Sequence, residues 1–302
     1  MALSLSELKA LTPSQLKTRQ DQRRLPLGER ADPPSIAPVN STPLSRFLTR
    51  AAVRFLWTRR PHYGRLLFLT SRICIKQCDL MHLSEATTME FLRKHTSLPI
   101  PKVYCAFKHG NRTYIVMERI RGRVIVDGWL QRTDESRAQL LAQLKGYLDE
   151  MRALEPPVPG MVQGVYGSKL EDFRVGVNGI GGYGPFPSVS AFHHFLVSGI
   201  GVLPGGLPDM NRLAQFYADS THKACFTHGD LSALNILVKG DKVVGIIDWE
   251  MAGWYPEYWE YSNAWNVHPY LDFWRDEVPK YLDAYPREVE MDLIRRRWFG
   301  DI

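Results

Sequence analysis

One segment restricts the fold of this chain more than any other: FTHGDLSALNILVKGDKVVGIIDWE, residues 226–250. Two apolar runs flank Gly240 and Asp241, a pattern that predicts a β-hairpin over residues 236–247. Asn235 follows Asp230 by five positions, and Asp248 follows Asn235 by 13. We therefore expect the hairpin to bring these three polar side chains to one of its ends.

Those three residue types suit phosphoryl transfer. That reaction requires a group that accepts the proton of the attacking hydroxyl, and oxygen ligands that hold Mg²⁺ against the phosphates. Asp230, Asn235 and Asp248 meet this need. An isolated Asp is often only a turn residue or a helix cap, but the joint spacing with His228 and Gly229 favours chemistry over that interpretation.

The first half of the chain indicates a small β-rich lobe. The runs VRFLW, RLLFLT and ICIKQ are rich in β-branched and aromatic residues and predict three antiparallel strands, and KVYCAF with TYIVMERI predicts a hairpin. One helix is expected between them, with Ser84 as its N-cap and its end before Pro99. Its Glu85 shares a face with Met89 and Leu92, so the carboxylate needs a cationic partner, and Lys76 is the nearest candidate.

The second half indicates a mainly helical lobe. Residues 134–154 place a stripe of apolar side chains on one helix face, consisting of Leu140, Leu141, Leu144, Leu148 and Met151. Residues 155–187 are dense in Gly and Pro, and their NGIGGYGPF lacks the flanking strand and helix of a phosphate-binding loop. The aromatic-rich sequence after Pro256 predicts two or three packed helices. The Trp and Tyr cluster around Trp254 could stack on a planar or sugar substrate, but its helical spacing favours the core. The adjacent His193 and His194 point to different helix faces, so we expect no shared metal.

The motifs HGDLSALN and IIDWE resemble the aminoglycoside phosphotransferase-like family of the protein-kinase-like fold, which also contains choline kinases. HGD stands where protein kinases have HRD, and IDWE where they have DFG. The longer run IIDWEMAGWYPEYWEY and the upstream SEATTMEFLRKHTSLPIPKVY are similar to a fungal-type group of such proteins. The resemblance covers roughly residues 65–265 and is specific. It implies an α+β, two-lobed protein-kinase-like fold with a small antiparallel-sheet N-lobe carrying one helix and a larger, mainly helical C-lobe.

The resemblance also implies the roles of individual residues. Asp230 is expected to be the catalytic base, and Asn235 and Asp248 are expected to ligate Mg²⁺. Lys76 would hold the ATP phosphates and pair with Glu85. The run YIVMERI resembles the hinge between lobes, where the backbone of Glu118 and Ile120 would bind the adenine edge. Further expectations concern Met117, which would line the adenine pocket, His228, which would brace the catalytic loop, and Glu260, which would anchor that loop from behind.

Residues 1–45 form a different kind of segment, with six prolines and a short predicted helix near residues 5–11. Residues 1–60 hold 11 Lys and Arg against 4 Asp and Glu, whereas the remainder is nearly neutral. Such a basic arm suits nucleic acid or an anionic membrane, but without an RNA-binding signature we expect a solvated extension. We therefore predict an extension over 1–45, an N-lobe over 46–120 and a C-lobe over 121–302.

Composition excludes several classes of protein. Four cysteines without a CxxC pair argue against a disulfide framework or a structural zinc site. The N-terminal sequence has no continuous apolar core of a signal peptide, and no run of 18 apolar residues occurs. We expect a soluble, cytoplasmic monomer with a small-molecule hydroxyl substrate and no nucleic-acid or membrane partner.

Three functional hypotheses follow. The first is an ATP-dependent kinase that phosphorylates a small-molecule hydroxyl, with ATP and Mg²⁺ as cofactors. The second is a catalytically weak or silent pseudokinase that binds nucleotide or a partner, because only Gly64 lies where a glycine-rich phosphate loop is expected. The third is a nucleic-acid binder that uses residues 1–60. The sequence does not identify the phosphate acceptor, because specificity in such folds lies in variable loops, here around 155–205, and in the C-terminal helices.

Overall fold

A computed structural model of the chain describes residues 36–79, 83–175, 182–199, 201–202, 205–267 and 269–299. Most of the expected extension over 1–45, including the short helix near residues 5–11, lies outside these ranges. Pro34–Ile302 form one compact unit, to which the following description applies. Within the described ranges, no helix combines the length and the apolar composition that crossing a bilayer requires.

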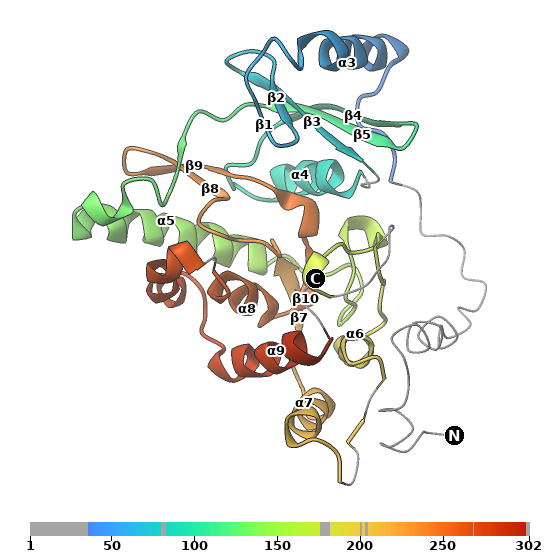
Figure 1. The fold of residues 1–302 in the computed structure, drawn as a ribbon, viewed down its shortest axis with the longest axis vertical. Coiled ribbons are helices and arrows are strands. Elements are labelled where there is room, and N and C mark those ends of the chain that lie inside the picture. Colours follow the sequence, from blue (N-terminus) through green and yellow to red (C-terminus); the bar gives the residue numbers. More distant parts are fainter. Residues whose placement is uncertain are drawn as a thin grey trace. The chain divides into compact units, whose positions relative to one another are not determined.

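The N-terminal part of this unit is built on one antiparallel sheet of five strands in the order β1-β2-β3-β5-β4 (Figure 1). The predicted hairpin is present, because β4 and β5 pair across the turn at Gly110. Strand β3 occupies the centre, with Lys76 opposite Ile115 of β5 and Leu66 of β2. The five strands are β1 (His62–Tyr63), β2 (Leu66–Phe68), β3 (Ile73–Asp79), β4 (Val103–His109) and β5 (Arg112–Glu118).

Two helices cover the two faces of this sheet (Figure 1). Helix α4 (Ser84–His95) lies on the side of the C-terminal lobe and buries Met89 and Leu92 in the main core with Ile115 and Met117. Helix α3 (Pro43–Leu56) lies on the opposite face, where Val53 packs against Cys105, Phe107 and Tyr114. Because side chains alternate along β5, its residues 114 and 115 face different helices.

The strand predicted at VRFLW is wrong, because Val53–Leu56 form the last turn of α3 and Trp57 caps it. The helix begins at an N-terminal signal further upstream. The Thr42 hydroxyl accepts from the N–H of Ser45, the Ser45 hydroxyl accepts from the N–H of Thr42, and Pro43 occupies the first turn. This capping box directs the following residues into a helix, and their β-branched and aromatic composition does not override it. The first strand of the sheet is instead the short β1.

Helix α4 also begins one residue earlier than the sequence predicts. Ser84 is its first helical residue, and Leu83 occupies the N-cap position without a side-chain hydrogen bond. The predicted face is confirmed, because Glu85, Met89 and Leu92 are all buried. The chain then passes Pro99 and Pro101 and enters β4.

The C-terminal lobe is mainly helical, and its longest helix carries the predicted apolar stripe, with all five side chains buried. Residues 176–181, which include the first four residues of NGIGGYGPF, lie outside the described ranges. The helices of this lobe are α5 (Asp134–Arg152), α6 (Val189–Leu196), α7 (Pro208–Ala218), α8 (Trp259–Trp265) and α9 (Pro286–Phe299). Its short 3-10 helices are η1 (Trp129–Gln131), η2 (Val165–Gly167), η3 (Phe173–Val175), η4 (Trp249–Met251), η5 (Pro269–Asp276) and η6 (Val278–Lys280).

Two small sheets hold the segment around residues 226–250. Strands β6 (Arg123–Val124), β8 (Ile236–Lys239) and β9 (Lys242–Ile246) form one, and the predicted turn at Gly240 joins β8 to β9. Strands β7 (Ala224–Thr227) and β10 (Gly253–Pro256) form the other. The catalytic-looking loop therefore lies between β7 and β8, fixed at both of its ends.

The aromatic cluster is core, as expected. Trp249, Trp254, Tyr255, Tyr258 and Trp259 are all fully or almost fully buried. His193 is buried as well and hydrogen bonds Tyr258 at 2.9 Å between Nε2 and the hydroxyl oxygen. The sheet lobe with one inserted helix, followed by a larger helical lobe, is the α+β two-lobed kinase-like fold that the sequence predicts.

Candidate active site

Lys76 of β3 connects the two lobes. Its ammonium nitrogen lies 2.8 Å from Oε2 of Glu85 on α4 and 2.6 Å from Oδ1 of Asp248 in the C-terminal lobe. Lys76 and Asp248 are 172 residues apart in the sequence, so only the tertiary fold brings them together. The structure therefore brings together three residues that the motifs assign to nucleotide and metal binding.

A third carboxylate, Glu250, shares the same ammonium at 3.1 Å from its Oε2. Arg65, in the turn between β1 and β2, places Nη1 3.5 Å from the same oxygen. Glu85, Asp248 and Glu250 offer carboxylate oxygens within 4.8 Å of one another, a spacing that suits a cation. The Lys76 ammonium lies among them, so protein charge already neutralises part of this acidic group.

The buried cluster shifts the pKa values of Lys76 and Glu85. Burial by itself lowers the pKa of Lys76, but the three carboxylates outweigh it, so this pKa lies well above its ordinary value. Burial raises the pKa of Glu85 to about 7, against the opposing effect of Lys76. Lys76 is thus a permanent cation, whereas Glu85 holds a proton at mildly acidic pH.

The loop after β7 presents Asp230 and fixes it through Asn235. The Asn235 amide nitrogen donates to the backbone carbonyl of Asp230 at 2.8 Å and to its Oδ2 at 3.0 Å. The backbone carbonyl of Asn235 accepts from the N–H of Ile247 at 3.0 Å. Asp248 follows Ile247 directly, so one loop and one hairpin bring all three polar residues to the end of β8 and β9.

His228 and Glu260 hold this loop from behind. The Glu260 carboxylate on α8 accepts from the backbone N–H groups of His228 and Gly229. His228 Nε2 lies 2.9 Å from the carbonyl oxygen of Ile247, and its Nδ1 accepts from the N–H of Asp230. Burial lowers the pKa of His228, which fits a neutral ring that donates at Nε2 and accepts at Nδ1. His228 thus ties the loop to the strand that precedes Asp248.

Two backbone conformations shape the site. Gly229 has φ +83°, and a Cβ atom there would lie 2.5 Å from the carbonyl oxygen of Met251, so only glycine fits between His228 and Asp230. Asp248 has φ +69°, in the left-handed region that non-glycine residues seldom adopt. This turn ends the strand run and directs the Asp248 carboxylate toward Lys76, with 38% of the side chain exposed.

Arg174 is a site residue that the sequence patterns did not indicate. Its Nη1 lies 3.6 Å from Oδ1 of Asp230, and its Nη2 donates to the carbonyl of Gly229. Nitrogens of the same guanidinium bind the fully buried carboxylate of Asp172, at 2.8 Å from Nε to Oδ1 and 3.0 Å from Nη2 to Oδ2. Burial raises the pKa of Asp230 above its ordinary value, and Arg174 opposes this rise.

Different signals could have indicated these missed residues. Glu250 lies two positions after Asp248 in the quoted motif and was not assigned a role. Arg65 lies beside Gly64, where a phosphate loop was expected. Arg174 and Asp172 carry no such signal, because they occur in a Gly- and Pro-rich stretch that indicates only a loop. Their place beside Asp230 is a property of the folded chain.

The predicted hinge residues lie at the end of β5. Met117 is buried on the α4 face of the sheet, within the main core. The backbone N–H of Glu118 is used within the protein, because it donates to the carbonyl of Lys102 at 2.8 Å. Over the described residues, the N–H of Ile120 donates to no other backbone group. Of the two predicted hinge residues, Ile120 is therefore the one whose N–H no other described backbone group accepts.

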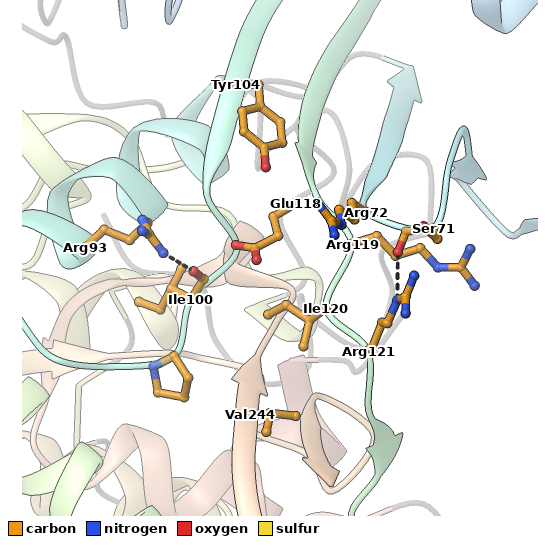
Figure 2. A pocket seen from close by; sticks show the side chains of 11 residues that line it. Ser71, Arg72, Arg93, Ile100, Tyr104, Glu118, Arg119, Ile120, Arg121 and Val244 are labelled. Carbon is orange, nitrogen blue, oxygen red and sulfur yellow. Dashed lines mark hydrogen bonds between the residues drawn. The ribbon is translucent and has the colours of Figure 1, made fainter.

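A pocket of about 500 Å³ lies beside this hinge segment (Figure 2). Figure 2 shows the Glu118 carboxylate between Arg93 and Arg72, with Tyr104 above it. Arg93 donates to the carbonyl of Ile100 at 2.6 Å, and Arg121 donates to that of Ser71 at 3.1 Å. Lys76, Asp230, Asn235 and Asp248 do not line this pocket, so it is separate from the polar centre described above.

The polar centre provides oxygen atoms suited to a hard cation. Among the described residues, no donor hydrogen bonds to Oδ1 of Asn235, because its amide nitrogen makes both contacts to Asp230. Asp248 contacts Lys76 through Oδ1. An amide oxygen and a half-exposed carboxylate are ligands that Mg²⁺ accepts, together with water and phosphate oxygens. The donor set therefore fits the predicted metal.

This sheet lobe, crossing segment and helical lobe, with a loop aspartate, an asparagine and a second aspartate at their junction, form the arrangement of the protein-kinase-like fold. Residues 203–296 match the family model described as the phosphotransferase enzyme family, APH. This match confirms the resemblance to aminoglycoside phosphotransferases that the motifs indicate. No curated protein sequence matches the chain significantly.

Solved structures support the same fold. A thermostable mutant of aminoglycoside phosphotransferase APH(4)-Ia in ternary complex with ADP and hygromycin B is 14% identical, with a TM-score of 0.54 over 82% of this chain and 88% of that chain. The apo form of a thermostable APH(4)-Ia mutant gives a TM-score of 0.51 at 14% identity and the same coverages. The gentamicin complex of APH(2'')-IIa gives 0.50 at 12% identity, over 86% of each chain. At these identities the likeness establishes the fold.

Proposed function

We propose that this protein is an ATP-dependent phosphotransferase that transfers the γ-phosphate of ATP to a hydroxyl group of a small molecule. One observation carries the proposal: Lys76 of the sheet lobe lies 2.6 Å from Asp248 of the helical lobe. Stability alone does not require this ion pair, because burying a lysine among three carboxylates carries a large desolvation cost. A site that binds phosphates and a metal needs charges of both signs at this position.

Asp230 is proposed as the catalytic base. Its side chain is 37% exposed, so a substrate hydroxyl can reach it. Asn235 fixes Oδ2, while Arg174 approaches Oδ1. Both contacts favour the ionised carboxylate, which is the form that accepts a proton.

Asn235 and Asp248 are proposed as the Mg²⁺ ligands, through the amide oxygen and the carboxylate. When bound, the ion neutralises the charge of the phosphate oxygens. The ammonium of Lys76, held in place by Glu85, would then bind the nucleotide phosphates. Glu85 lies on α4 with its carboxylate buried, so it sets the position of Lys76 and does not contact the nucleotide.

Arg65 is proposed to replace part of the missing glycine-rich loop. The β1–β2 connection is a tight turn at Gly64 and Arg65, with Tyr63 paired to Leu66, so it offers few backbone N–H groups to a phosphate. The Arg65 guanidinium, half exposed and 3.5 Å from Glu250, lies at the same end of the site. A bidentate cation supplies the charge that backbone donors provide elsewhere.

ATP is proposed as the phosphoryl donor, with its adenine edge on the N–H of Ile120 and beside Met117. The complexes of similarly folded proteins with ADP and hygromycin B, and with gentamicin, support a nucleotide and a small-molecule acceptor. The alternative is a catalytically weak or silent pseudokinase that binds nucleotide or a partner. The short β1–β2 turn favours that alternative, whereas the intact arrangement of Lys76, Asp230, Asn235 and Asp248 favours the enzyme.

The deciding experiment measures Mg²⁺-dependent ATP binding by calorimetry, and then ATP turnover with aminoglycosides, amino alcohols and sugars as acceptors. Asp230→Asn should keep ATP binding and lower turnover by a factor of about 100 to 10,000, the usual effect of losing a general base. Asp149→Asn is the matched control, because Asp149 lies exposed on α5 and forms an ion pair with Lys145 of the same helix. It should leave turnover unchanged.

Two results would contradict the proposal. Turnover that survives in Asp230→Asn would remove Asp230 as the base. Mg²⁺-dependent ATP binding without turnover of any acceptor, and without slow ATP hydrolysis, would favour the pseudokinase.

A further inference from the structure

The face of helix α3 that packs on the sheet includes Ser45, Thr49 and Val53. Thr49 is its one buried residue, Val53 contacts the cluster of Cys105, Phe107 and Tyr114, and the Cys105 thiol lies 3.5 Å from the Ser45 hydroxyl. Positions 45, 49 and 53 follow one another at a spacing of four, so they form a single helix face.

Four large apolar side chains of α3 point outward. Leu44 is 66% exposed, Phe47 66%, Leu48 55% and Phe55 58%. Their spacing of three, four and eleven positions from residue 44 places them on one stripe, opposite to the face that contacts the sheet. Figure 1 shows α3 on the outer side of the sheet, away from α4. A helix normally buries such a stripe, but among the residues that the structure describes none covers this outer face of α3.

The charge around this stripe has one sign. Arg46, Arg50 and Arg54 are spaced four apart, which makes a row that borders the stripe at Phe47, and Arg59 and Arg60 follow the end of the helix. Residues 33–78 contain eight Lys and Arg and no Asp or Glu. Arg46 lies over the ring of Phe107 at 5.6 Å, whereas Arg50 and Arg54 are exposed.

We propose that α3 is a docking helix for an anionic membrane surface, with its stripe of Leu44, Phe47, Leu48 and Phe55 inserted among the lipid headgroups. The adjoining arginines would contact the lipid phosphates and carboxylates. Interfacial helices combine an apolar face with a basic flank. Their affinity for anionic membranes rises with the buried apolar area and with the number of basic residues near the surface. With 14 residues the helix lies in the interface and does not span the bilayer. This inference goes beyond the proposed phosphotransferase activity and does not depend on it, and it replaces the expectation of no membrane partner.

Charge disfavours the other occupants of this face. Two copies of the chain that met through α3 would bring two all-basic segments together, with no acidic residue in either to compensate. Nucleic acid would satisfy the arginines but leave the four apolar side chains in water. An anionic bilayer satisfies the charge and the apolar stripe at once. Because α4, with Glu85, lies on the other face of the sheet, docking through α3 leaves the candidate active site open.

The test is co-sedimentation of the full chain with vesicles at physiological salt. One vesicle set contains phosphatidylcholine alone, and the other contains about one third phosphatidylserine. The full chain should partition onto the anionic vesicles at least about tenfold more strongly, and added salt should weaken this binding. Phe47→Ser with Leu48→Ser, and separately Arg50→Glu with Arg54→Glu, should each lower the partition by at least about tenfold.

Leu130→Ser is the matched control, because Leu130 is 62% exposed in η1 of the other lobe. It should bind vesicles as the unaltered chain does. The proposal is overturned if the full chain stays in the supernatant with both vesicle sets, or if the Phe47 and Leu48 substitutions leave binding unchanged. A dimer in sedimentation velocity that these same substitutions dissociate would instead assign the face to a second copy. Circular dichroism would reveal whether the Phe47 and Leu48 substitutions disturb folding. In that case the Arg50 and Arg54 substitutions still decide the test.

Discussion

Arg174 places its Nη1 3.6 Å from Oδ1 of Asp230, although the two residues are 56 positions apart in the sequence. Arg174 is itself held by the buried carboxylate of Asp172 and by the carbonyl of Gly229. The proposed base therefore faces a fixed positive charge. Because the positive charge favours the ionised carboxylate, Arg174 controls the pH range in which Asp230 can accept a proton.

This relationship predicts the pH profile of turnover. Burial raises the pKa of Asp230 and Arg174 opposes the rise, so activity should be lost on the acid side at a higher pH than for an ordinary aspartate. Arg174→Gln removes the opposing charge and should move the acid limb of kcat/KM to still higher pH. Arg174→Lys keeps the charge and should move it less. Identical profiles for all three proteins would show that Arg174 does not act on the base.

Asp248→Asn tests the metal site. The substitution keeps the shape of the side chain but removes the charge that Mg²⁺ requires, so ATP affinity measured with Mg²⁺ should fall to the level measured with EDTA. Calorimetry in the two buffers gives the comparison. Asp241→Asn serves as control, since Asp241 lies in the β8–β9 turn and contacts Arg132. If Mg²⁺ still strengthens ATP binding in Asp248→Asn, the metal ligand has been misassigned.

Glu85→Gln tests the buried cluster through stability. Because the pKa of Glu85 in the folded protein is about 7 and its ordinary value is 4.5, the folded state binds the proton more tightly than the unfolded state. The free energy of unfolding should therefore fall as pH rises from 4.5 to 7, by on the order of 3 kcal/mol from this group. Glu85→Gln should remove that part of the slope in urea titrations across this range. An unchanged slope would show that Glu85 is ionised throughout.

Arg65→Ala tests the substitute for the phosphate loop. Loss of a half-exposed cation beside the phosphates should weaken Mg-ATP binding by about fivefold to tenfold, with a smaller effect on kcat. Arg60→Ala is the control, because Arg60 is exposed at the end of the turn after α3. Titration calorimetry and the KM for ATP give the two readouts. Equal affinities in both variants would leave the β1–β2 turn without a role in phosphate binding.

Much of this protein is predictable because its signals are local. The hairpin after Asn235 follows from two short apolar runs around Gly240, and the buried stripe of α5 follows from the helical period. The failure at Val53–Trp57 is local as well. β-branched and aromatic residues favoured a strand, whereas the capping box at Thr42 and Ser45 lies upstream of the window in which the strand was predicted. Because residues 53–57 were predicted as a strand, the outward apolar stripe of α3 was not predicted either.

The sequence by itself determined which polar residues meet at the candidate site, because the spacing of Asp230, Asn235 and Asp248 specifies one loop and one hairpin. The tertiary structure alone decided what surrounds them. Arg174 reaches Asp230, Glu250 joins Lys76, and α3 turns its phenylalanines outward only once the chain is packed. The physical reason is that periodicity and turn chemistry act over a few residues, whereas ion pairs and exposed faces depend on segments that are far apart in the sequence.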